Sequence, residues 1–226
     1  MNATTRAALV VAASLALWQA AIPVARAQSS GNVLANGNFD SDTSGWTVPA
    51  NPGVSFTRSS FDAIDSASSG SGFVSNGNYG SPTVVATSAC LSMSSGLDYD
   101  VAAHMAVPAG QQPVTGSCGM WVDWFDNDCV GAGSQYLTTT YLPEIQNVTL
   151  DPDTIWQLFA TRVTPPTAAK LRAQVVLQTN LVNSYPAAPD FLCYFDQLVL
   201  SPAGGTPIPL FGNGFESAFG WSATVP

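Results

Sequence analysis

The sequence has few positive charges. Its 226 residues include six Lys and Arg and one His against fifteen Asp and Glu, a net charge of −9. The basic residues beyond the N-terminal region are Arg58, Arg162, Lys170 and Arg172, which are too few and too scattered to form a basic patch. An acidic surface of this kind repels phosphate backbones. We therefore expect no nucleic-acid partner and no anionic lipid surface, and a ligand that is neutral or cationic.

Beyond its N-terminus, the sequence lacks any apolar run of membrane-spanning length. The early apolar run at 7–22 is followed by PVARA at 23–27, which ends in an Ala-x-Ala cleavage pattern. This pattern predicts a secretory signal peptide over residues 1–27. An uncleaved anchor is the alternative, disfavoured because the run is short and ends at Pro23. Cleavage removes Arg6 and Arg26 and no acid, which leaves four basic and fifteen acidic residues and a net charge of −11. We expect a secreted protein, periplasmic, extracellular or held at the cell surface, with no membrane insertion.

The sequence also lacks the usual signs of an enzyme. His104 is the single imidazole, no G-x-S-x-G elbow surrounds a serine, and no C-x-x-C occurs. A nucleophile triad and a zinc site therefore have little support. A carboxylate pair for glycoside hydrolysis requires only that two acids meet, but the acid-rich WFDNDC and LDPD stretches have the composition of turns. We predict a protein that is not an enzyme.

Four cysteines lie in the predicted mature chain, at Cys90, Cys118, Cys129 and Cys193. An even number in an exported protein predicts disulfides, with three possible connectivities. If 119–125 is a strand, it spans roughly 23 Å, which places Cys118 and Cys129 at opposite ends of the domain. A disulfide needs Cα atoms within about 7 Å. Cys90 precedes the turn at 94–96, at the end to which the chain returns at Cys129, so we predict Cys90–Cys129 and Cys118–Cys193.

Between residues 32 and 201 the sequence alternates between apolar and polar residues in short segments, broken by Gly, Pro, Asn and Ser, with no amphipathic helix. This pattern predicts an all-β fold, a jelly-roll β-sandwich of two antiparallel sheets. The expected strands are 53–58, 83–93, 99–107, 119–125, 136–142, 155–163, 169–179 and 191–200.

Alternation along three of these strands separates core from surface. Met120, Val122 and Trp124 point one way, which leaves Trp121, Asp123 and Phe125 on the opposite face. By the same reasoning Arg172 and Gln174 point outward from 171–178, and His104 points outward from 99–105. An exposed Trp–Asp–Phe row is a candidate binding surface. The alternative is that a loop at 127–135 or 180–190 covers this face, which would make the aromatic residues part of the core.

Several stretches, in this order, resemble one protein family. They are N-G-x-F-D…G-W at 36–46, SSGLDYDVAAHM at 94–105, IWQLFATRVTPP at 155–166 and F-D-x-L-x-L at 195–200. The domain at 32–201 is similar to the secreted jelly-roll carbohydrate-binding modules of families 4, 9 and 22. The resemblance implies stacking of a neutral glycan on exposed aromatic rings, with amides and carboxylates on its hydroxyl groups and no chemical step. The residues expected to bind are Trp121, Asp123, Phe125, His104, Arg172 and Gln174. The alternative is a structural or adhesive exported protein that keeps the scaffold without a sugar site.

The same resemblance implies one structural calcium ion, held by the acid of the first strand, the Asp of the last strand and nearby backbone carbonyls. The matching residues are Asp40 and Asp196, while the usual second acid beside the latter is Gln197. Ca²⁺ takes several oxygen ligands of these kinds. The alternative is that Asp40 caps a turn and Asp196 is an ordinary edge residue.

The opening stretch has a second copy near the end of the sequence, NGFESAFGW at 213–221, after a Gly- and Pro-rich linker at 202–209. Residues 210–226 resemble the GFES…W tails that end many exported proteins of Gram-negative bacteria. So short a segment buries no core of its own. We expect a recognition or processing tag, with an edge strand or the vestige of a lost module as alternatives.

Overall fold

The structure is a computed structural model that describes residues 31–64, 69–78, 82–111, 115–146, 155–183 and 190–203. The predicted signal peptide, most of the linker and the C-terminal tail lie outside these residues. In the described part of the chain, no helix is long and apolar enough to cross a membrane.

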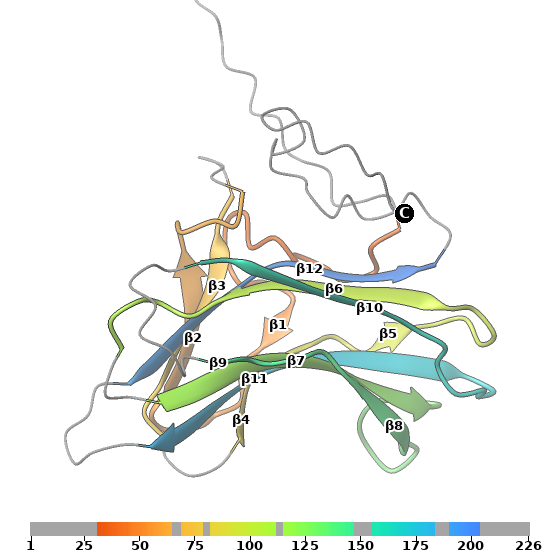
Figure 1. The fold of residues 1–226 in the computed structure, drawn as a ribbon. Coiled ribbons are helices and arrows are strands. Elements are labelled where there is room, and N and C mark those ends of the chain that lie inside the picture. Colours follow the sequence, from red (N-terminus) through yellow and green to blue (C-terminus); the bar gives the residue numbers. More distant parts are fainter. Residues whose placement is uncertain are drawn as a thin grey trace, which may run out of the picture.

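The strands form two antiparallel sheets that pack as layers, with β6, β10 and β12 lying over β7, β11 and β8 (Figure 1). Sheet A has the order β1-β4-β11-β7-β8, with β5 paired to β11 and β9 to β7. Its strands are β1 (Trp46–Thr47), β4 (Pro82–Ser88), β5 (Leu91–Ser92), β7 (Thr115–Asp126), β8 (Gln135–Tyr141), β9 (Ile145–Gln146) and β11 (Leu171–Asn183). Sheet B has the order β10-β6-β12-β3-β2, with β2 (Val54–Ser59), β3 (Ser71–Asn76), β6 (Tyr99–Ala106), β10 (Gln157–Val163) and β12 (Phe191–Pro202). The predicted all-β sandwich is confirmed.

The sequence prediction differs from the structure at several strands, and the two-residue strand β9 is one that was not expected. The expected strand 83–93 is two strands, β4 and β5, because the chain leaves the sheet at Ala89 and Cys90. Strand β3 was not expected, because its Ser, Gly and Asn content is typical of a loop. Gly72 within it is required by packing, since a Cβ atom there would lie 2.6 Å from the ring of Phe56.

The core follows the predicted alternation. The inward residues of β6, β7 and β11 are all at most 3% exposed, namely Tyr99, Val101, Ala103, Met105, Met120, Val122, Trp124, Leu171, Ala173, Val175 and Leu177. Removing this apolar surface from water is the main stabilising contribution to the sandwich. Because side chains alternate along a strand, every second side chain of the central strands lies on an outer face of the sandwich.

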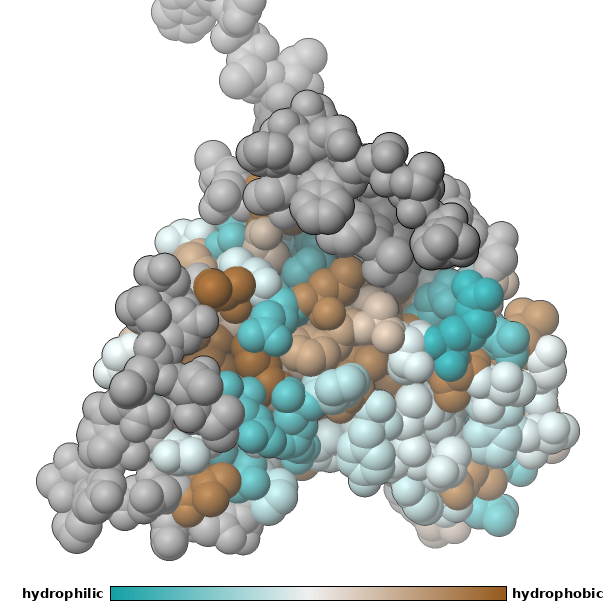
Figure 2. Space-filling model, in the orientation of Figure 1, coloured by the Kyte–Doolittle hydropathy of each residue, from teal (hydrophilic) through white to brown (hydrophobic). Residues whose placement is uncertain are grey.

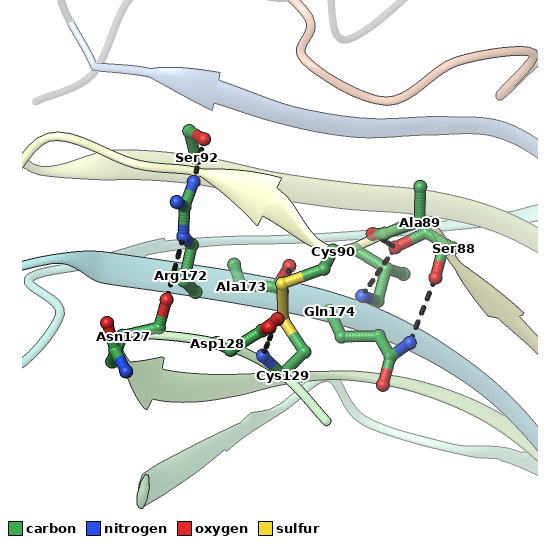
Figure 3. Close-up of a disulfide and its surroundings, with 11 residues drawn as sticks. Ser88, Ala89, Cys90, Ser92, Asn127, Asp128, Cys129, Arg172, Ala173 and Gln174 are labelled. Carbon is green, nitrogen blue, oxygen red and sulfur yellow. Dashed lines mark hydrogen bonds between the residues drawn. A yellow bond between two sulfur atoms is a disulfide. The ribbon is translucent and has the colours of Figure 1, made fainter. Parts of the chain in front are cut away.

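Two disulfides connect the elements, in the predicted pairing. Cys90 is joined to Cys129 with Cα atoms 5.7 Å apart, beside Ala173 of β11 (Figure 3). Cys118 of β7 is joined to Cys193 of β12 with Cα atoms 6.5 Å apart, which links sheet A to sheet B through the core.

The opening stretch, residues 36–46, closes the sandwich against β12. Phe39 is fully buried and its ring lies 5.8 Å from that of Trp46 and 5.6 Å from that of Phe56. The carbonyl of Gly37 accepts a hydrogen bond from Leu198 N at 2.9 Å. A Cβ atom at Gly37 would lie 2.4 Å from the Leu198 carbonyl oxygen, so the close approach requires glycine.

Candidate functional site

Five of the six residues predicted to bind a ligand lie together on the outer face of sheet A. Neighbouring strands β7 and β11 pair Asp123 with Gln174 and Phe125 with Arg172, and Trp121 lies two residues before Asp123 on the same face. Paired residues share a face of the sheet, so the outward residues that alternation identified on β7 and β11 form one surface.

His104 does not join this group. It lies on β6 of sheet B, opposite Asp196 of β12, and points outward from the other side of the sandwich. Alternation identifies an outward residue but not the sheet to which its strand belongs. The structure therefore excludes His104 from a shared site with Trp121.

Two tyrosines of β8 extend the surface, and the sequence reasoning missed both. Tyr141 pairs with Trp121 and Tyr136 pairs with Phe125, and they are 68% and 56% exposed. The ring centroids are 6.0 Å apart in the first pair and 5.9 Å in the second. We call these four side chains, Trp121, Tyr141, Phe125 and Tyr136, the aromatic row.

A β-bulge explains why the tyrosines were missed. They are five residues apart, so strict alternation places them on opposite faces. The register of β8 shifts between its pairings with Trp124 and Phe125, and Leu137 is the extra residue. Leu137 packs against the core, and both tyrosines consequently face outward. Trp121 and Phe125 are partly exposed, so the aromatic row is not part of the core.

Asp123 lies between the two aromatic pairs, and its carboxylate is engaged on both oxygens. Oδ2 accepts a hydrogen bond from Trp121 Nε1 at 3.1 Å, and Oδ1 accepts one from Thr139 Oγ1 at 2.5 Å. The Thr139 hydroxyl also lies 2.8 Å from the Tyr136 hydroxyl. The network orients the indole and the phenol from one central carboxylate.

The remaining polar residues of this face are also paired. Arg172 donates from Nε to the Asn127 carbonyl and from Nη1 to Ser92 Oγ, so its guanidinium holds the β7–β8 hairpin to β5 (Figure 3). Gln174 Nε2 donates to the Ser88 carbonyl at 3.0 Å. Arg172 and Gln174 thus have structural partners.

Beyond Trp121, the outer face ends in a polar group. Glu144 accepts hydrogen bonds from Ser117 Oγ at 2.7 Å and Gln178 Nε2 at 2.8 Å. Gly119 lies between Ser117 and Trp121 on this face of β7. A Cβ atom at Gly119 would lie 3.0 Å from Glu144 Cγ, so glycine leaves room for the Glu144 side chain. The face therefore presents aromatic rings along one part and, at one end, the exposed carboxylate of Glu144, which the buried Ser117 and Gln178 hold in place.

The residues predicted to hold calcium lie elsewhere. The Asp40 side chain is exposed, and its backbone carbonyl accepts a hydrogen bond from Arg58 Nε at 3.1 Å. Asp196 is fully buried on the outer side of sheet B, and burial raises the pKa of its carboxyl to about 8. Within the described ranges, no group of three or more His, Cys, Asp or Glu residues is placed to hold a metal ion. Calcium binding stays a prediction.

No family model and no curated protein sequence matches the chain. Among solved structures, the enzymatically active domain of bacteriophage CBA120 tailspike protein 4 is similar at 14% identity and a TM-score of 0.51. That match covers 76% of this chain and 21% of the other, so this chain spans about a fifth of the tailspike chain.

Two carbohydrate-binding modules are also similar. A family 16 module has 16% identity and a TM-score of 0.45, with 75% of this chain and 99% of the other covered. The CBM22-1 xylan-binding domain from Paenibacillus barcinonensis has 16% identity and a TM-score of 0.46, with 77% and 96% covered. At these identities the likeness concerns the fold alone.

Proposed function

We propose that the protein binds a neutral glycan on the outer face of sheet A and catalyses no reaction. The observation that carries the proposal is the aromatic row, in which two largely exposed tyrosines accompany two partly exposed rings on paired strands. Aromatic rings supply flat apolar area for the C–H faces of sugar rings at a low cost in conformational entropy.

The geometry suits an extended ligand. Trp121 and Phe125 are four residues apart on β7, about 13 Å along the strand. The two aromatic pairs therefore form two contact points, separated by Asp123, rather than one pocket. Beyond Trp121, the exposed Glu144 offers carboxylate oxygens for sugar hydroxyls at one end.

The charges of this face favour a neutral ligand. The carboxylate of Asp123 is engaged by Trp121 and Thr139, and the guanidinium of Arg172 by Asn127 and Ser92. The surface over β8 is pale in Figure 2, intermediate between hydrophilic and hydrophobic, which fits its Thr and Tyr content. A ligand with many anionic groups would meet an acidic protein with few free cations.

The test is affinity electrophoresis of the mature protein through gels that contain soluble xylan, mixed-linkage glucan or mannan. We expect retardation by at least one neutral polysaccharide, which Trp121→Ala and Tyr141→Ala each reduce. Val130→Ala is the matched control, because Val130 is 67% exposed in the hairpin loop beyond the aromatic row. Equal retardation of Trp121→Ala and the wild type would show that the polysaccharide does not bind on the aromatic row. No binding to any polysaccharide would favour the structural or adhesive alternative.

A further inference from the structure

The disulfide between Cys90 and Cys129 ties together two segments from opposite sides of β11. Leu91 of β5 and Trp124 of β7 both pair with Ala173, so β5 and β7 flank β11. Cys90 directly precedes β5 and Cys129 follows β7, so the bond between them crosses β11 (Figure 3). It therefore joins the β7–β8 hairpin to the segment between β4 and β5.

Local strand pairing explains why Cys90 is exposed. Between the pairings with β11 at Thr87 and at Leu91, the chain places three residues, 88–90, opposite two residues of β11. An extra residue of this kind displaces a strand locally from its sheet. Ala89 and Cys90 are exposed as a result.

The second disulfide has the opposite environment. Cys118 and Cys193 are both 0% exposed between the two sheets, whereas Cys129 is 6% exposed and Cys90 is exposed. Thiol–disulfide exchange depends on the access of the attacking thiolate to the disulfide, and exposed disulfides are the labile ones. Of the two bonds, Cys90–Cys129 is therefore the one that a thiol reaches in the native fold.

The accessible disulfide restrains the hairpin that carries one ring pair of the aromatic row. Phe125 lies four residues before Cys129 on β7, and Tyr136 lies seven residues after it on β8. Arg172 makes a parallel connection through hydrogen bonds to the hairpin and to β5. The disulfide is the covalent part of this connection.

We propose that Cys90–Cys129 is a thiol-exchange site, at which a dithiol reductant releases the hairpin and weakens binding on the aromatic row. The effect on binding rests on the proposed glycan-binding function. The selective exchange and the release of the hairpin do not depend on it.

The exchange has two steps. A thiolate of the dithiol attacks the Cys90 sulfur, which forms a mixed disulfide and releases the Cys129 thiolate, and this thiolate takes up a proton. The second thiolate of the reductant then attacks the reductant's own sulfur in the mixed disulfide and releases Cys90, which also takes up a proton. The protein gains two electrons and two protons, and the dithiol leaves as a cyclic disulfide.

Opening the bond should affect the two ends of the aromatic row differently. Phe125 and Tyr136 lose a covalent restraint and must be ordered again when a ligand binds, at a cost in conformational entropy. Trp121 lies three residues after Cys118, whose bond stays closed. We therefore expect binding that is weakened but not abolished, with Kd raised about tenfold.

The test treats the folded mature protein with dithiothreitol in the absence of denaturant and traps free thiols with iodoacetamide before peptide mapping. We expect label on Cys90 and Cys129 and none on Cys118 and Cys193. Amide hydrogen exchange should become faster in the hairpin at 127–135, because its tether is open. Affinity electrophoresis through a polysaccharide that retards the oxidised protein should give the rise in Kd.

The matched control is the double variant Cys90→Ser, Cys129→Ser, which keeps the buried disulfide. It should bind as the reduced wild type does, and dithiothreitol should change neither its hydrogen exchange nor its Kd. Circular dichroism checks that its fold is kept. The comparison of oxidised and reduced wild type needs no variant, so it decides the question even if the double variant does not fold.

Three outcomes count against the proposal. Label on all four cysteines together, or on none, would overturn it, because no disulfide would then be selectively accessible. Label on Cys90 and Cys129 with unchanged hydrogen exchange and unchanged Kd would show that the bond does not restrain the hairpin. If the oxidised protein binds no polysaccharide, glycan binding and its weakening by reduction both fail, and labelling with hydrogen exchange alone decides whether the exchange site exists.

Discussion

The position of Asp123 between two ring pairs leads to a test of how it acts. We expect Asp123 to position the Trp121 indole rather than to contact the ligand, because both of its oxygens are already engaged by protein donors. Asp123→Asn keeps the shape but removes the charge and one acceptor. The free energy of glycan binding should then weaken by about 1 kcal/mol, the contribution of one charge-assisted hydrogen bond at a partly exposed site. This corresponds to roughly a fivefold rise in Kd.

Trp121→Ala sets the reference for that effect. If one face of the indole, roughly 100 Å², is covered by the ligand, its loss costs about 2.5 kcal/mol in binding. The expected rise in Kd is then about 70-fold. The two effects are not independent, because the hydrogen bond from Asp123 acts on the side chain that Trp121→Ala removes.

A double-mutant cycle measured by calorimetry decides between the two roles. In the Trp121→Ala background, Asp123→Asn should change Kd by less than about twofold, since the side chain that it positions is absent. An indole fluorescence shift in Asp123→Asn without ligand would report the altered position. If Asp123→Asn costs the same fivefold in both backgrounds, Asp123 contacts the ligand directly and our reasoning is refuted.

The fold supports two further predictions. Replacing Cys118 and Cys193 together by Ser should lower the free energy of unfolding by about 4 kcal/mol in the chain-entropy model, because the two residues are separated by 75 positions. Calorimetric unfolding that gives the same Tm for the variant and the wild type would contradict this prediction. Gly37→Ala should lower the free energy of unfolding by more than about 2 kcal/mol, because its Cβ would overlap the Leu198 carbonyl oxygen 2.4 Å away. Gly96→Ala should lower it by only about 1 kcal/mol of backbone strain, because Gly96 has a φ of +81° but nothing within 4 Å of a Cβ atom. Urea unfolding compares the two glycine variants, and equal losses would show that the close approach at Gly37 relaxes without cost.

Much of the fold was predictable because burial repeats along the chain with a regular period. Residues such as Met120, Val122 and Trp124 alternate without interruption, and the same spacing placed Cys118 and Cys129 too far apart to bond. Strand β3 was missed because Gly72 is there for the packing of Phe56, a partner distant in sequence. Local composition carries no information about such a contact.

The candidate site was predictable in part for the same reason. Trp121 and Asp123 follow from alternation within one strand, whereas Tyr136 and Tyr141 depend on a bulge whose extra residue, Leu137, is defined only by pairing with β7. His104 was grouped wrongly, because alternation shows that its side chain points outward but does not show to which sheet its strand belongs.

The covalent bond between Cys118 and Cys193 has a mechanical consequence. A polymer bound on the aromatic row, as we propose, would pull on β7, and any attachment of the chain beyond Ala203 would pull on β12. Because Cys118 lies three residues before Trp121, tension between these two points passes from β7 through the sulfur atoms into β12. The segment between the two cysteines, which contains β8 to β11, is a covalently closed loop that this tension does not draw out into an extended chain. The residues inside that loop would therefore add no length to the path between a bound polymer and β12.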